Sequence, residues 1–120
     1  MSATAAELTK KRCAPCEGGV PRMSPDAVRE HLAALPAWKL TPDGQRIRRE
    51  WRVKDFATAL DFFNSVGQIA EQEDHHPDLH LTGYRNVAIE LWTHAAGGLT
   101  ENDFILAAKI DTLPVTLKNE

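Results

Sequence analysis

The sequence has neither an excess of positive charge nor a long apolar run. Its 14 Lys and Arg residues stand against 17 Asp and Glu residues, which gives a formal net charge of -3. No basic surplus is available to neutralise a phosphate backbone, and this absence disfavours nucleic-acid binding. A membrane-spanning helix needs about 20 successive apolar residues, and the sequence shows neither such a segment nor a secretory leader. We expect a cytoplasmic protein without nucleic-acid or membrane partners.

Cysteine is also scarce. Cys13 and Cys16 are the two cysteines among 120 residues, too few for the disulfide framework of a small secreted protein. Their spacing is half of a zinc knuckle, but no second pair follows, and no strand precedes them as in a thioredoxin site. We expect free thiols, although a zinc site shared between subunits stays open. With 42% hydrophobic residues, stability must come from packing in a single domain.

The apolar periodicity divides the chain near residue 24. Residues 1–23 show no sustained apolar period and predict a loosely held tail that adds little to the core. Residues 24–113 form the predicted domain, and residues 114–120 form a second tail. Within the domain, the periodicity, turn residues and helix caps predict helices over 24–35, 55–76 and 100–113, and strands over 38–40, 45–53, 79–82 and 87–94.

This order of helix, two strands, helix, two strands and helix predicts an α+β fold. Two short hairpins cannot each bury a face alone, so the economical packing is a four-stranded antiparallel sheet with three helices on one face. The longest helix carries an apolar stripe at helical spacing, made of Phe56, Leu60, Phe63, Gly67 and Ala70.

Four of the five histidines lie between residues 75 and 94. If the long helix reaches His75, Glu71 lies one turn behind it on the same face, where the carboxylate can fix the imidazole's tautomer and stabilise its protonated form. His76 is adjacent and precedes Pro77, which pushes the backbone out of the helix. We therefore expect two imidazoles that aim in different directions.

His94 lies at the end of the last predicted strand. The strand's alternation puts it on the face opposite the apolar residues, so it should point away from the core. A helix end that meets this strand end would bring His75, His76 and His94 around one cleft. Such an arrangement is suited to proton transfer with a small ligand near neutral pH.

Each candidate also has a structural explanation. A lone histidine such as His31 or His80 is usually a surface or hydrogen-bonded residue. Glu71 can be an ordinary helix carboxylate, and Asp103 fits the third position of a helix start. Tryptophans such as Trp38 are more often packing residues than ligand platforms. Sequence alone leaves these alternatives open.

Metal binding competes with acid–base chemistry, because imidazoles suit zinc. His75 and His76 are adjacent and do not readily chelate one ion together. His76 and His80 have a suitable separation only within a helix, which Pro77 opposes. We expect no metal.

The spaced residues resemble one known family. Its pattern is an acid, three residues, His-His-Pro, an aromatic residue, a further His and an Asp. The sequence supplies this pattern as Glu71, His75, His76, Pro77, Tyr84, His94 and Asp103. Over about residues 24–112 the chain is similar to the pterin-4a-carbinolamine dehydratases, also called 4a-hydroxytetrahydrobiopterin dehydratases. The resemblance implies a four-stranded antiparallel sheet with three helices, homodimers or homotetramers, and no cofactor, since the pterin is the substrate.

The resemblance also implies an activity. Aromatic amino acid hydroxylases, which are candidate partners, leave their pterin as a 4a-carbinolamine, and the dehydratase removes water to give quinonoid dihydropterin. The alternatives are an adaptor of the same fold that binds a partner helix, and a role in molybdenum-cofactor metabolism.

The resemblance assigns roles to the spaced residues. We expect His75, backed by Glu71, to be the principal acid and base. His94 is expected to assist the opposite proton transfer, and His76 to hold the pterin ring. Further substrate contacts are expected from Trp38, from Tyr84 and from Asp103, which also supports His94 or the site rim.

Overall fold

The computed structural model describes residues 4–14 and 21–118, so Cys16 and its predicted free thiol lie outside the described residues. The helices are α1 (Ala5–Lys10), α2 (Pro25–Ala34), α3 (Phe56–Glu73) and α4 (Glu101–Asp111), with a short 3-10 helix η1 (His94–Ala96). The strands are β1 (Lys39–Leu40), β2 (Ile47–Arg52), β3 (Asp78–Thr82) and β4 (Asn86–Leu91).

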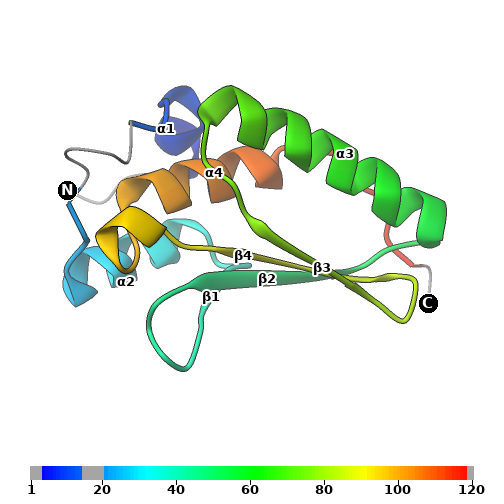
Figure 1. Cartoon of the computed structure of the whole chain (residues 1–120), viewed down its shortest axis with the longest axis horizontal. Helices are drawn as coiled ribbons and strands as arrows, with labels where there is room; N and C mark the ends of the chain where they lie inside the picture. The colour runs from blue at the N-terminus through cyan, green and yellow to red at the C-terminus, as the bar shows by residue number, and fades with distance from the viewer. Residues whose placement is uncertain (1–3, 15–20, 119–120) are drawn as a thin grey trace.

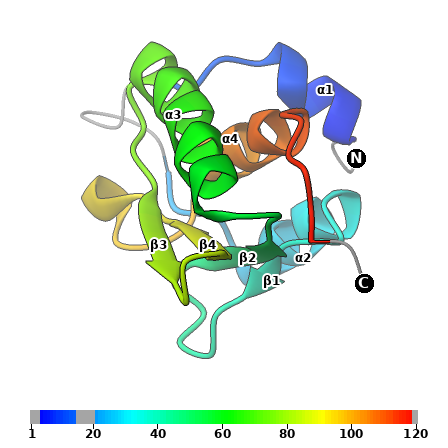
Figure 2. The same cartoon turned by 90° about the vertical axis from the view of Figure 1, so that its right-hand side faces the viewer.

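The strands form one antiparallel sheet in the order β1-β2-β4-β3. Helices α3 and α4 lie over one face of this sheet, and α1 packs against α4 (Figures 1 and 2). The predicted α+β fold is confirmed, with α1 as an additional helix. In the described part of the chain, no helix combines the length and apolar character needed to cross a membrane.

Helix starts and turns follow the local sequence signals. Ser24 Oγ accepts a hydrogen bond from the N–H of Ala27 at the start of α2, and Asp55 Oδ1 accepts one from the N–H of Thr58 at the start of α3. In the turn between β1 and β2, Gly44 has a φ of 72°, a conformation that favours glycine. Because these signals act within a few residues, the sequence predicted the elements closely.

The predicted apolar stripe of α3 coincides with its buried face only at Ala70, and Phe63 is partly buried. Phe56 and Leu60 are 49% and 43% exposed. Helix α3 therefore has an outer apolar stripe and an inner one, and periodicity alone does not tell which packs on the sheet. The inner face is formed by Ala59, Phe62, Val66 and Ala70.

The prediction that residues 1–23 add little to the core is wrong. Leu8, on α1, is fully buried within the hydrophobic core. Cys13 and Met23 are partly buried against the same core. A helix of 6 residues with one large apolar side chain has no sustained apolar period, so the sequence pattern did not reveal this packing.

Helix α3 ends at Glu73, before it reaches His75. Asp74 adopts the left-handed conformation with a φ of 51°, and its N–H donates to the carbonyl of Ala70. The N–H of His75 donates to the same carbonyl at 3.2 Å, which closes the helix. Glu71 and His75 therefore do not stand one helical turn apart on a common face.

Candidate active site

The β3–β4 hairpin brings the two histidine segments to one end of the sheet. Asp78, at the start of β3, pairs with Glu90, near the end of β4. Residues just before β3 and just after β4 therefore lie at the same end of the hairpin. His75 and His76 precede β3, and His94 follows β4. The expected meeting of a helix end and a strand end is present in the backbone.

Asp103 joins these two segments. Its side chain, in the first turn of α4, is fully buried. Its Oδ1 lies 2.6 Å from His75 Nε2, and its Oδ2 accepts hydrogen bonds from Thr93 Oγ1 at 2.9 Å and from the N–H of Thr100 at 3.0 Å. Thr93 directly precedes His94. One buried carboxylate thus ties the end of α3 to the residue before His94.

The contact with Asp103 fixes the tautomer of the His75 ring. A carboxylate oxygen only accepts hydrogen bonds, so the Nε2–H of His75 is the donor in this contact. Because the Asp103 carboxylate also accepts the N–H of Thr100, it forms one half of the predicted capping box at the start of α4. We expected Asp103 to support His94 or the site rim; its carboxylate bonds to His75 and to Thr93, the residue that precedes His94.

Glu71 contacts His76 rather than His75. Glu71 Oε2 lies 2.5 Å from His76 Nε2, and the side chains are 76% and 58% exposed. The prediction that Glu71 backs His75 is therefore wrong. Its physical reason is the left-handed Asp74, which ends α3 early and leaves His76, not His75, beside the last turns of the helix. The site holds two histidine–carboxylate pairs, one buried and one exposed.

His94 is exposed as predicted, but the prediction that it ends the strand is wrong, because β4 ends at Leu91. It follows the end of β4 and begins η1. Its ring meets the ring of Trp92 edge-on, with centroids 5.1 Å apart, and the guanidinium of Arg46 lies 4.7 Å from the centroid of the Trp92 ring. These contacts hold His94 at the surface near the end of the sheet.

Trp38 and Tyr84 are not brought to the histidines. Trp38 is 2% exposed, and its Nε1 donates to Asp111 Oδ1 at 3.0 Å, so in this chain it packs and offers a substrate almost no surface. Tyr84, which is 56% exposed, lies in the turn between β3 and β4. The whole of β3, at about 3.3 Å per residue, separates it from His76.

Thr93 is a site residue that sequence analysis missed. It is 1% exposed, and it follows Val87, Ile89 and Leu91 in the inward positions of the alternating pattern. A hydroxyl at an inward position needs a buried hydrogen-bond partner. The inward position of Thr93 therefore indicated a buried polar group on the core side of the strand. That group is the carboxylate of Asp103, which accepts the hydrogen bond of the Thr93 hydroxyl.

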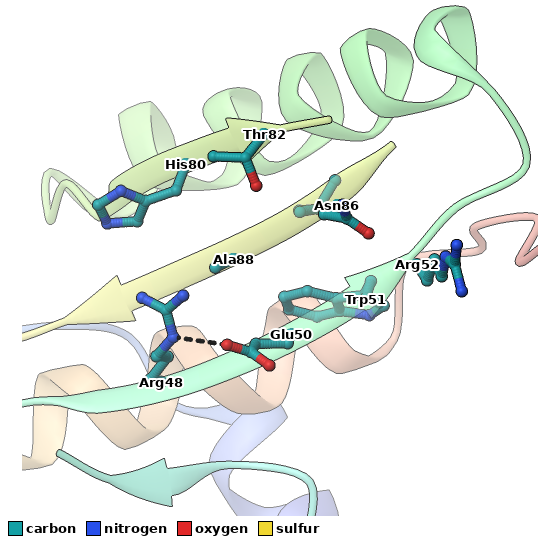
Figure 3. Close-up of a pocket in the computed structure, with 9 residues that line it drawn as sticks. Arg48, Glu50, Trp51, Arg52, His80, Thr82, Asn86 and Ala88 are labelled. Carbon is teal, nitrogen blue, oxygen red and sulfur yellow. Dashed lines mark hydrogen bonds and ion pairs between the residues drawn. The ribbon is translucent and has the colours of Figure 1, made fainter. Parts of the chain in front are cut away.

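A hollow of about 640 Å³ lies on the open face of the sheet and holds none of the predicted site residues. Figure 3 shows Arg48 and His80 on its two sides, with Ala88 between them. Arg48 Nε donates to Glu50 Oε2 at 3.0 Å, so these two charges at the hollow are paired. Within residues 4–14 and 21–118, no group of three His, Cys, Asp or Glu side chains is arranged to hold a metal ion. A second hollow, along α3, is lined by Glu71 but by none of the histidines. The histidine–carboxylate contacts therefore mark the candidate site.

Comparisons with known proteins agree with the sequence resemblance. The family model described as pterin 4 alpha carbinolamine dehydratase matches residues 21–113. Over 113 residues the chain is 52% identical to pterin-4-alpha-carbinolamine dehydratase 2, mitochondrial, of Arabidopsis thaliana, covering 92% of this chain and 60% of that protein. It is also 46% identical over 106 residues to a relative from Halorhodospira halophila, covering 88% of this chain and 96% of the relative.

A solved structure shows the same fold. The crystal structure of a transcriptional coactivator/pterin dehydratase from Brucella melitensis has a TM-score of 0.70 and 34% sequence identity, and the match covers 75% of this chain and 95% of that one. The chain therefore belongs to the pterin-4-alpha-carbinolamine dehydratase family.

Proposed function

We propose that this chain catalyses the dehydration of a 4a-hydroxytetrahydropterin. In this reaction the bond between C4a and the hydroxyl oxygen breaks, and the hydroxyl leaves with an added proton as water. N5 loses its proton as the double bond between C4a and N5 of quinonoid dihydropterin forms. The substrate is neither oxidised nor reduced overall, so acid–base groups suffice and the proposal includes no cofactor. Membership of the family and the name of the Arabidopsis relative support it.

The observation that carries the proposal is the buried Asp103 carboxylate, which bonds to both His75 and Thr93. It orders two segments that each present an exposed imidazole, His76 on one and His94 on the other. Imidazoles with an ordinary pKa of about 6.5 can give or take a proton near neutral pH. A well-placed acid or base contributes about 10²- to 10⁴-fold to a rate.

The exposure of the rings supports a division of roles. His76, beside Glu71, and His94 have ring surface that a substrate can reach, so we assign the acid and base steps to them. His75 is 5% exposed, and we assign it a positioning role, because a ring anchored on Asp103 fixes the backbone from which His76 projects. This allocation differs from the sequence expectation, in which His75 was the principal acid and base.

The proposed partners follow from the reaction and from one exposed surface. The substrate is a pterin carbinolamine, the product class of aromatic amino acid hydroxylases. The outer stripe of α3, with Phe56 and Leu60 exposed, supports self-association of this chain as a homodimer or homotetramer.

The adaptor and molybdenum-cofactor alternatives are not favoured, although the Brucella neighbour is described as a coactivator as well as a dehydratase. The cytoplasmic location stays a prediction.

Fresh carbinolamine also loses water without a catalyst, so the test compares rates with and without protein in a stopped-flow spectrometer. The wild-type protein should exceed the uncatalysed rate, and His94→Ala should lower the catalysed rate by about 100-fold. The matched control is His80→Ala, which removes an exposed imidazole on the open face of the sheet and should change nothing. A wild-type rate equal to the uncatalysed rate overturns the proposed activity. An unchanged rate in His94→Ala overturns the role of His94 alone.

A further inference from the structure

The N-terminal segment, residues 4–14, lies outside the family match at 21–113 yet is firmly attached to the fold. Leu8 is buried in the core, and α1 packs against α4. The stretch that follows α1 then runs from α1 toward α3 (Figure 2, in blue). The segment thus reaches α4, which carries Asp103, and the end of α3, which His75 follows.

Asn102 holds the main chain of this segment at Ala14. Asn102 Oδ1 accepts a hydrogen bond from the N–H of Ala14 at 2.9 Å, and Asn102 Nδ2 donates to the carbonyl of Ala14 at 2.8 Å. Both backbone hydrogen-bonding groups of Ala14 are satisfied by one side chain, and Asn102 is 2% exposed. Two hydrogen bonds from one buried side chain fix the orientation of the Ala14 main chain as well as its distance from Asn102.

Glu73 holds the preceding residue. Its Oε1 accepts a hydrogen bond from the N–H of Cys13 at 2.8 Å, and its Oε2 lies 2.9 Å from Lys109 Nζ on α4. Burial and the nearby Glu73 carboxylate raise the pKa of the Cys13 thiol to about 12. The thiol is therefore protonated near neutral pH and poorly nucleophilic. Cys13 contributes a side chain that packs against the core and a main-chain N–H that binds Glu73.

The two contacts flank the buried pair in sequence and in space. Asn102 directly precedes Asp103 on α4, and Glu73, the last residue of α3, comes two residues before His75. A single stretch of main chain, Cys13–Ala14, therefore bridges the residues that stand next to both ends of the 2.6 Å contact between His75 and Asp103.

We propose that Asn102 and Glu73 are positioning residues, which use the main chain of Cys13 and Ala14 to hold His75 against Asp103. The N-terminal segment is then a working part of the site, although it precedes the residues that the family model matches. The catalytic consequence rests on the proposed dehydratase function, but the effect on the His75 ring does not. A shift of about 1 Å in a positioned group can cost up to about 100-fold in rate.

The test is nuclear magnetic resonance of the His75 ring in Asn102→Ala. In the wild type, the proton on Nε2 should exchange slowly with water, because Asp103 accepts it in a buried site. In Asn102→Ala we expect that exchange to be at least about tenfold faster, and kcat to fall about tenfold with KM within about twofold. The matched control is Glu101→Gln, which breaks the exposed contact of Lys11 with α4 and should change neither quantity.

Alkylation of Cys13 in a Cys16→Ser background reports whether the segment has been released. Faster alkylation in Asn102→Ala with an unchanged His75 proton overturns the proposal. If Asn102→Ala does not fold, the same measurements on Glu73→Ala, which removes the acceptor of the Cys13 N–H and the contact with Lys109, decide by the same criterion. A faster His75 exchange in a protein whose wild type has no dehydratase activity upholds the positioning and overturns only the proposed function.

Discussion

The two histidine–carboxylate pairs, His75–Asp103 and His76–Glu71, share the same chemical groups but differ in their exposure to water and in their further hydrogen bonds. In the buried pair His75 is 5% exposed and Asp103 is fully buried, and the carboxylate is also bonded to Thr93 and Thr100. In the other pair the Glu71 and His76 side chains are 76% and 58% exposed to water. Breaking a desolvated pair leaves unpaired buried groups, whereas an exposed pair exchanges its partner for water. In the proposed site the buried pair therefore has the structural role, and the exposed pair has the surface that a substrate could contact.

The largest expected effect comes from breaking the buried pair. Asp103→Ala removes the carboxylate that the His75 ring, the Thr93 hydroxyl and the N–H of Thr100 share. We expect the free energy of unfolding to fall by about 3–5 kcal/mol, measured by urea denaturation. A loss below about 1 kcal/mol would show that the buried pair does not stabilise the fold.

The next largest loss of stability is expected from removing the core contact of α1. Leu8→Ala removes a fully buried side chain from the core and should lower the free energy of unfolding by about 2–4 kcal/mol. Thermal or urea unfolding measures it, with Leu117→Ala, which truncates a leucine that is 53% exposed, as the control. Equal small losses in both variants would mean that α1 is held as loosely as the sequence suggested.

The contact between Glu73 and the N-terminal segment should make the stability of the fold depend on pH. Burial alone would raise the pKa of Glu73, but hydrogen bonds from Lys109 and from the N–H of Cys13 hold its pKa below the ordinary 4.5. The unfolded chain therefore takes up this proton more readily than the folded one. The resulting stability is present above pH 4.5 and is lost as the pH falls below it.

Urea unfolding at a series of pH values measures this effect in the wild type and in Glu73→Gln. Below pH 4.5 the wild type should lose unfolding free energy more steeply than the variant, because only the wild type can protonate this carboxylate. Parallel curves for the two proteins would contradict the assignment.

The smallest effect on stability is expected from the exposed pair. Glu71→Gln should change the free energy of unfolding by no more than about 0.5 kcal/mol. If His76 is an acid or base, the same variant should still slow carbinolamine dehydration, by about tenfold. A variant that is as active as the wild type would remove Glu71 from the site.

Short-range signals predicted most of the fold. Ser24, Asp55 and Thr100 each precede a helix because capping acts within three or four residues, and the two hairpins follow from alternation and turn residues. The sequence also indicated the histidine segments that converge, because an antiparallel hairpin must return to its starting end.

The end of α3 and the contacts between residues far apart in the sequence were not predictable from the same signals. The left-handed Asp74 is a single residue, yet it decides whether Glu71 meets His75 or His76. Leu8 is buried by tertiary packing that leaves no periodic trace. The partner of His75 lies 28 residues away in sequence, and no local pattern links two residues so far apart.

In the proposed mechanism the buried pair holds the site while exposed imidazoles exchange protons. The single-turnover rate of carbinolamine dehydration by His76→Ala, measured together with its urea unfolding curve, tests this most directly. We expect a rate about 100-fold below the wild type with an unfolding curve that is nearly superimposable. A wild-type rate, or a loss of rate that comes with loss of the fold, would contradict it.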